Sequence, residues 1–278
     1  MIGSTELPVL EMHPSGALVM HEEWDPLRVK KLTERLLGEK VLKNPPIVAP
    51  ISGTESLVVL DGANRTAAFQ ELGIKHIVAQ IVSYNDPGVK VESWNHVVSG
   101  LDAELLITTI VNIADIKLEK CSLDDARESL SKGEAIGYLV FEHDVRKVLA
   151  SRVSDIKDLR ILNDIVGAYK GKAKIFRASN DEWEKQSPYY PGITALVVFP
   201  SYQPDDIMAA VKNGYKIPSG VTRHIIPYRA LNINIPLDIL QADHSLQEKR
   251  EWLNDWLMER MAANAIRYYA EPTFSFNE

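Results

Sequence analysis

The sequence has a single cysteine, Cys121, and no long hydrophobic run. One cysteine excludes a disulfide framework within the chain and fits a reducing compartment. No apolar run reaches the roughly 18 residues that a membrane-spanning helix needs, and residues 1–20 lack the pattern of a signal peptide. These absences together predict a cytoplasmic protein.

An excess of positive charge is also missing. The formal net charge is −7, so broad attraction to nucleic acid is not expected, although a local basic groove would be compatible with this charge. An apolar fraction of 45% and a charged fraction of 25% are ordinary for a globular protein. A chain of 278 residues can form one large hydrophobic core or, as we expect, two smaller ones.

Two well-known phosphate-binding signatures are absent as well. The sequence has no Gly-x-x-x-x-Gly-Lys-Ser/Thr loop and no protein-kinase signature set. Any kinase activity must therefore use a different geometry to hold phosphate.

A strand–turn–helix pattern occupies residues 57–73. Four apolar residues end at Asp61-Gly62, and a helix-favouring run then continues to Gly73. A helix N-terminus exposes backbone N–H groups that favour an anion, and the planar guanidinium of Arg65 can hold a phosphate or a carboxylate. Alternatively, Asp61 only caps the helix and Arg65 is a solvated charge.

Hydrophobic periodicity and turn signals predict mixed helices and strands along the rest of the chain, with no repeat. Asp25 is a good N-cap for a helix that starts at Pro26, and the break at 84–88 marks a domain boundary. Further helices are expected at 103–113, 123–130, 156–169, 204–213 and 245–269, and strands within 7–20 and at 47–48, 76–82, 115–119, 135–141, 174–177 and 195–199. We interpret the tryptophans of the last helix as core or interface residues.

Four polar clusters lie far apart in the sequence. They are His21-Glu22-Glu23, Asp61 to Arg65, Trp94-Asn95-His96, and Thr222-Arg223-His224 within an expected loop at 218–227. Taken singly, each histidine could be structural and the two glutamates could be solvated charges. Taken together, they supply what phosphoryl transfer requires, namely anion-binding loops, cations, and a carboxylate that takes a proton from an attacking hydroxyl.

These clusters, with Asp25-Pro26-Leu27-Arg28 and Asn44-Pro45-Pro46-Ile47, resemble the free L-serine kinases that have a ParB/sulfiredoxin-like N-terminal domain. Those enzymes form O-phospho-L-serine from serine and a nucleotide, ADP or ATP, and so belong to amino-acid metabolism. The resemblance covers most of the chain. Asp-Gly-x-x-Arg alone is shared with the wider ParB-like superfamily, whereas its combination with Thr-Arg-His is specific.

The resemblance implies a mixed α/β fold of two domains with the active site in the cleft between them. Residues 1–88 would form the ParB/sulfiredoxin-like nucleotide-binding domain, and residues 89–278 a mixed α/β substrate domain. The resemblance also implies that Glu22 is the general base and that His224 is catalytic as well. The residues expected to contact the nucleotide are Asp61, Gly62, Ala63, Asn64, Arg65 and Thr66, and Asp61 would also bind Mg²⁺ or its waters. The residues expected around serine and the transferred phosphate are Trp94, His96, Thr222, Arg223 and His224.

The sequence departs from this family at Asn64, where the family usually has histidine. Asparagine keeps a donor and an acceptor but cannot carry positive charge. A second hypothesis is therefore a ParB-like nucleotide-sensing or DNA-binding regulator without turnover. The acidic charge balance and the absence of a helix-turn-helix with a basic recognition helix argue against DNA binding.

Overall fold

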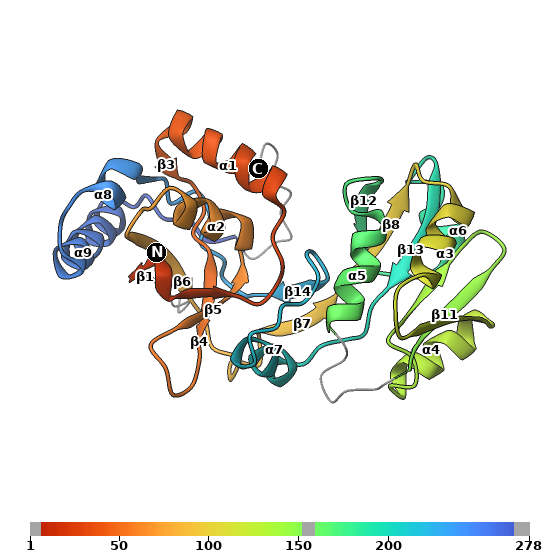
Figure 1. Ribbon diagram of the computed structural model, residues 1–278. Coiled ribbons are helices and arrows are strands. Elements are labelled where there is room, and N and C mark those ends of the chain that lie inside the picture. Colours follow the sequence, from red (N-terminus) through yellow and green to blue (C-terminus); the bar gives the residue numbers. More distant parts are fainter. Residues whose placement is uncertain (1–6, 152–158, 270–278) are drawn as a thin grey trace. The chain divides into compact units, whose positions relative to one another are not determined.

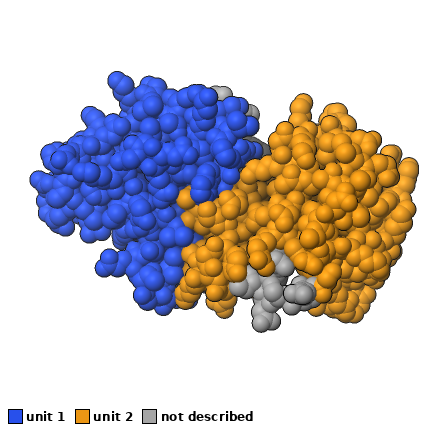
Figure 2. Space-filling model, in the orientation of Figure 1, with its two compact units in different colours: residues 1–19, 24–89, 226–278 blue, residues 20–23, 90–225 orange. Residues whose placement is uncertain are grey.

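The computed structural model describes residues 7–151 and 159–269. The chain forms two compact units, which Figure 2 distinguishes by colour. Unit 1 contains residues 1–19, 24–89 and 226–278, and unit 2 contains residues 20–23 and 90–225. This division differs from the predicted ranges 1–88 and 89–278, because the C-terminal segment belongs to unit 1.

Unit 1 is built on a five-stranded sheet with the strand order β1-β6-β4-β5-β2. β4 and β6 are parallel, whereas β1 with β6 and β4 with β5 are antiparallel. The strands are β1 (Val9–Pro14), β2 (Leu18–Met20), β4 (Ile47–Pro50), β5 (Leu57–Asp61) and β6 (His76–Ile81). A short 3-10 helix (Ser15–Ala17) connects β1 to β2, and a two-residue strand β3 (Val41–Leu42) pairs with β15 (Ile235–Pro236).

Two helices of unit 1 begin at side-chain caps. The side chain of Asp25 accepts hydrogen bonds from the backbone N–H groups of Leu27 and Arg28, and Pro26 occupies the first turn, so α1 starts at the predicted residue. Ser245 and Glu248 form a capping box for α9. The helices are α1 (Pro26–Glu39), α2 (Ala63–Glu71), α8 (Leu237–Gln241) and α9 (Leu246–Ala262).

Unit 2 contains a six-stranded sheet with the order β12-β8-β13-β10-β11-β9 (Figure 1). The neighbouring strands of this sheet pair in antiparallel fashion. The strands are β8 (Asn95–Ser99), β9 (Ile116–Lys120), β10 (Gly137–Val140), β11 (Val145–Ala150), β12 (Lys174–Ala178) and β13 (Ile193–Val198). A separate two-stranded sheet joins β7 (Lys90–Ser93) to β14 (Thr222–Ile225).

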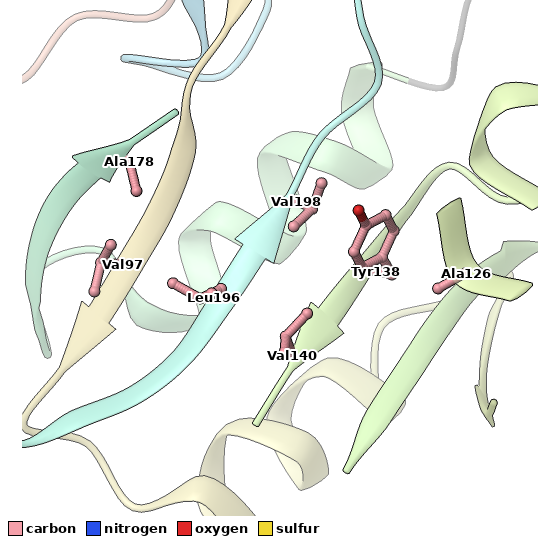
Figure 3. Packing of buried hydrophobic residues seen from close by; sticks show 7 residues of the cluster. All are labelled: Val97, Ala126, Tyr138, Val140, Ala178, Leu196 and Val198. Atoms are coloured by element: carbon pink, nitrogen blue, oxygen red, sulfur yellow. The ribbon is translucent and has the colours of Figure 1, made fainter. Parts of the chain in front are cut away.

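The helices of unit 2 are α3 (Ala103–Val111), α4 (Leu123–Ser131), α5 (Leu159–Tyr169), α6 (Trp183–Gln186) and α7 (Pro204–Lys212). Of these, α4 packs on β10 and β11, and α3 packs on β9 and α5. Figure 3 shows one buried cluster, in which a residue of α4 joins residues of four neighbouring strands: Val97, Ala126, Tyr138, Val140, Ala178, Leu196 and Val198. Burial of these contiguous apolar surfaces is what stabilises a unit of this size.

The mixed α/β prediction is confirmed, and two local expectations were wrong. Residues 222–225, expected in a loop, form strand β14, because β7 supplies its hydrogen-bonding partner from a distant part of the sequence. The last helix ends at Ala262 rather than at residue 269. Within the described parts of the chain, no helix is both long and apolar enough to cross a membrane.

Candidate functional site

The Asp61 turn of unit 1 connects β5 to α2 as predicted. Gly62 has a φ of 93°, in the left-handed region that favours glycine. A Cβ atom at this position would lie 3.0 Å from Nη1 of Arg65 and 3.1 Å from Cα of Pro46. The turn therefore requires glycine both for its backbone conformation and for the close approach of two neighbours.

The alternative interpretation of this turn, with Asp61 as the helix cap and Arg65 as a solvated charge, was wrong on both points. Gly62, and not Asp61, is the N-cap of α2, and the Asp61 carboxylate forms an ion pair with the guanidinium of Arg229. Arg65 is half-buried, and its Nη1 donates a hydrogen bond of 3.0 Å to the carbonyl oxygen of Pro45. The guanidinium is thus held in place beside the turn instead of moving freely in solvent.

A pocket of about 580 Å³ lies beside the Asp61 turn within unit 1. Its volume is in the range of small-molecule sites. Four basic residues line it, and they attract anions: Arg35, Lys43, Arg65 and Arg229. The remaining lining comes from α1, from residues 41–47, from Asp61, and from Ala230 and Leu231.

Sequence reasoning missed the contribution of residues 229–231 to this pocket. The buried side chain of Gln80 holds this segment, since its Nε2 donates to the carbonyl oxygen of Tyr228 and its Oε1 accepts from the N–H of Ala230, at 3.1 and 2.9 Å. Arg229 is 168 residues from Asp61 and belongs to no recognisable motif. No local signal could therefore have identified it.

Asn64 and Thr66 do not line the pocket. The Oδ1 atom of Asn64 accepts a hydrogen bond of 2.9 Å from the backbone N–H of Asp25, and so ties the first turn of α2 to the start of α1. Thr66 is fully buried. Among the six residues expected to contact nucleotide, only Asp61 and Arg65 contribute to the pocket lining.

Glu22 in unit 2 is held by the segment that precedes and begins β14. Its Oε2 accepts from the N–H of Gly220 at 2.9 Å, and its Oε1 accepts from the N–H and the hydroxyl of Thr222. Backbone hydrogen bonds between residues 21–23 and Ile217 fix the strand that carries Glu22.

Two histidines stand next to Thr222. Nε2 of His21 lies 2.7 Å from Oγ1 of Thr222, and the rings of His21 and His224 meet edge to face with centroids 5.2 Å apart. Because the Thr222 hydroxyl donates its proton to Glu22, we assign the proton of this contact to Nε2 of His21. The structure therefore brings together Glu22, Thr222 and His224 of the predicted site, and adds His21.

Arg223 lies on the other face of β14, since successive side chains of a strand point to opposite sides. Its guanidinium lies 4.3 Å from the ring centroid of Trp94 and 3.2 Å from a carboxylate oxygen of Glu92. Arg223 and Trp94 thus form a stacked pair on the face opposite Thr222 and His224.

His96 is buried beneath the loop that precedes β14. It is only 2% exposed, its Nδ1 lies 2.8 Å from the hydroxyl of Tyr169, and Phe199 packs against its ring. Burial, assisted by the positive charge of Arg177, lowers the pKa of His96 to about 4, against the opposing effect of hydrogen bonds with Ser219 and Gly220. The imidazole is therefore neutral near pH 7.

The described residues contain no group of three or more His, Cys, Asp or Glu side chains that could hold a metal ion. Asp61 is the carboxylate that was expected to contact a metal ion at this turn. It forms an ion pair with Arg229. A metal ion bound there would have to take most of its ligands from the nucleotide and water.

The chain is similar to curated L-serine kinases over most of its length. It is 28% identical to an ATP-dependent L-serine kinase of Staphylothermus marinus, covering 85% of this chain and 95% of the relative. It is 24% identical to the ATP-dependent L-serine kinase SbnI of Staphylococcus aureus, covering 95% and 96%. An ADP-dependent L-serine kinase of Thermococcus kodakarensis is 22% identical, covering 79% and 88%.

The chain therefore resembles L-serine kinases over most of its length. A solved free serine kinase in complex with AMP superimposes with a TM-score of 0.72, at 20% identity, over 85% of this chain and 95% of that structure. This likeness shows that the fold of the family is present. No protein-family model matches the sequence.

Proposed function

We propose that this protein transfers a phosphoryl group from ATP or ADP to the hydroxyl of free L-serine, giving O-phospho-L-serine. The observation that carries the proposal is the Glu22 carboxylate, which two backbone N–H groups hold in place while its Oε1 accepts a hydrogen bond from the hydroxyl of Thr222. The same contact with a serine hydroxyl is what a general base needs. The curated relatives that share the chain's full-length similarity carry this activity in their names.

Glu22 is the proposed base. In phosphoryl transfer a carboxylate accepts the proton of the attacking hydroxyl, and positioned proton transfer contributes a factor of about 10² to 10⁴ in rate. Thr222 and His224 share the face of β14 that Glu22 contacts, so we assign them to the acceptor and to the phosphoryl group being transferred. Trp94 and Arg223 form a stacked pair. The guanidinium of Arg223 is paired with the carboxylate of Glu92, so it would have to leave Glu92 in order to bind an oxygen of the phosphate or of serine.

The nucleotide is assigned to the pocket beside the Asp61 turn. Arg65 presents a planar fork next to the first turn of α2, and charge-assisted contacts of this kind bind phosphate strongly. Lys43, Arg35 and Arg229 add positive charge along the same pocket. Backbone N–H groups at the start of α2, from Ala63 and Asn64, supply further donors for a phosphate.

Mg²⁺ fits this assignment as an ion that arrives with the nucleotide. Mg²⁺ sites in phosphoryl-transfer enzymes commonly use one or two carboxylates together with phosphate oxygens and water, and Asp61 provides one such carboxylate. The ion would neutralise charge on the phosphates. Asp61 would have to release Arg229 for this contact, which makes the guanidinium of Arg229 available to a phosphate.

Mass spectrometry of a reaction mixture tests the proposal directly. Purified protein is incubated with L-serine, Mg²⁺ and either ATP or ADP, and phosphoserine is measured together with the nucleotide product. We expect phosphoserine with at least one donor, and formation slower by a factor of about 10² to 10⁴ with the Glu22→Gln variant. Nucleotide binding without phosphoserine would contradict the proposal and favour the regulator hypothesis, and salt-dependent DNA binding would then be the next measurement.

A further inference from the structure

The acceptor in the proposed reaction is a free amino acid, which carries a carboxylate on the carbon next to the one that bears the hydroxyl. A site that selects such a molecule needs a cation close to the base. Glu22 is negative, and Arg223 lies on the opposite face of β14. His21, Thr222 and His224 provide no permanent positive charge.

Arg177 supplies a cation at this place from a different element. It lies on β12, the edge strand that pairs with β8 (Figure 1), and its register partner on β8 is His96. Directly opposed residues of an antiparallel pair project to the same face of the sheet. Arg177 and His96 therefore share one face, and the positive charge of Arg177 contributes to the lowered pKa of His96.

Gly220 connects Arg177 to Glu22. A Cβ atom at Gly220 would lie 2.7 Å from Nη2 and 3.0 Å from Nε of Arg177, so the guanidinium rests against the α-carbon of this glycine. The N–H of the same glycine donates to Oε2 of Glu22 at 2.9 Å. One residue is thus in contact with both the proposed base and a guanidinium.

We propose that Arg177 binds the α-carboxylate of the amino-acid substrate and thereby selects free amino acids over simple amino alcohols. The inference rests on the proposed function and concerns the acceptor side of the same site. A planar guanidinium can hold a carboxylate through two parallel hydrogen bonds. With the carboxylate held at Arg177, the hydroxyl on the neighbouring carbon is directed toward Glu22.

Ethanolamine is the informative probe, because it has the hydroxyl and the amine of serine but no carboxylate. For Arg177→Gln we expect the KM for L-serine to rise about 10- to 100-fold, the range that one charge-assisted contact supports. The kcat/KM for ethanolamine should change by less than about threefold, and nucleotide affinity should stay the same. Lys174→Gln, an equal loss of charge on the same strand, should leave both acceptors unaffected.

Equal losses with L-serine and ethanolamine in Arg177→Gln would overturn the proposal and leave Arg177 as a support for the Gly220 loop. Titration calorimetry with each acceptor separates this proposal from the proposed function. If the wild-type protein makes no phosphoserine, weaker binding of L-serine but not of ethanolamine to Arg177→Gln still supports carboxylate recognition. Wild-type protein that binds neither acceptor, or both equally well, would overturn it.

Discussion

Glu22 and Glu23 are adjacent carboxylates that the structure treats differently. Glu22 contacts Gly220 and Thr222 through its side chain, whereas Glu23 donates a hydrogen bond from its backbone N–H to the carbonyl oxygen of Ile217. We expect Glu22→Gln to lower kcat by about 10² to 10⁴, because glutamine keeps the shape of the side chain but cannot accept the proton. Steady-state rates with L-serine, and nucleotide affinity by calorimetry, measure the two effects separately.

Glu23→Gln is the matched control and should retain nearly full activity. The amide of Glu22→Gln places an NH₂ group near the N–H of Gly220 or Thr222, so thermal unfolding of this variant has to be compared with that of the wild-type protein. A folded Glu22→Gln protein with normal turnover, or an inactive Glu23→Gln protein, would show that the base is assigned incorrectly.

Asn64 acts in the structure as a neutral hydrogen-bond acceptor. Its Oδ1 receives the N–H of Asp25 at 2.9 Å. A histidine at this position could accept the same hydrogen bond from Asp25 only while one of its ring nitrogens is unprotonated. In Asn64→His we therefore expect turnover within a few fold of wild type at pH 8, and a loss of activity and stability as the pH falls below about 6.5, the ordinary pKa of histidine.

The sign of this pH dependence decides between two roles. The contact with Asp25 holds the pKa of the introduced histidine below its unfolded value, so its stabilising effect is present above about pH 6.5 and is lost on acidification. If histidine served instead as a cation for phosphate, turnover would rise over the same interval. Rates and unfolding midpoints of both proteins between pH 5.5 and 8.5 provide the measurement, with the wild-type profile as the reference.

At the scale of elements, the Asp61 turn depends on Gly62. Alanine there would combine a left-handed backbone with a Cβ atom about 3 Å from Arg65 and Pro46. Strain of this kind costs on the order of 1–3 kcal/mol. We expect Gly62→Ala to lower the unfolding midpoint and to weaken nucleotide binding, because Arg65 has to move.

Gly53 provides a matched control for this variant. Its φ is 81°, in the same region, but no atom lies within 4 Å of a Cβ built there. Gly53→Ala should therefore show a modest loss of stability and unchanged nucleotide affinity in calorimetry. Equal nucleotide affinities of the Gly62→Ala and Gly53→Ala proteins would indicate that the turn does not hold the nucleotide.

Elements with strong local signals were predicted correctly, and elements defined by distant partners were not. Asp25-Pro26 determines the start of α1, and the strand–turn–helix at Asp61 follows from its own residues. Strand β14 was predicted as a loop, because flanking prolines give a turn signal, whereas its pairing with β7 is a contact between residues about 130 positions apart. The same reason explains why Arg229 could not be recognised beside Asp61.

On the scale of the whole molecule, the predicted ranges 1–88 and 89–278 differ from the two compact units, because the segment that carries α9 belongs to unit 1. Several apolar residues of α9 recur at helical spacing, but this spacing does not say which sheet they pack against. In the structure α9 packs on β1, where Nε of Arg250 donates to the carbonyl oxygen of Met12 at 3.1 Å.

Leu253 on α9 tests this assignment, because it is 2% exposed and far in sequence from the Asp61 turn. Leu253→Ala should destabilise unit 1 by about 2–5 kcal/mol, the usual cost of such a truncation in a core. Hydrogen exchange followed by mass spectrometry should then show faster exchange in β1 and β6, with little change in β8 and β13 of unit 2. Saturating nucleotide should slow exchange again in unit 1, since a ligand that binds only the folded state stabilises it by mass action. Faster exchange in β8 and β13, with β1 unchanged, would instead place α9 with the second core, as its position in the sequence had suggested.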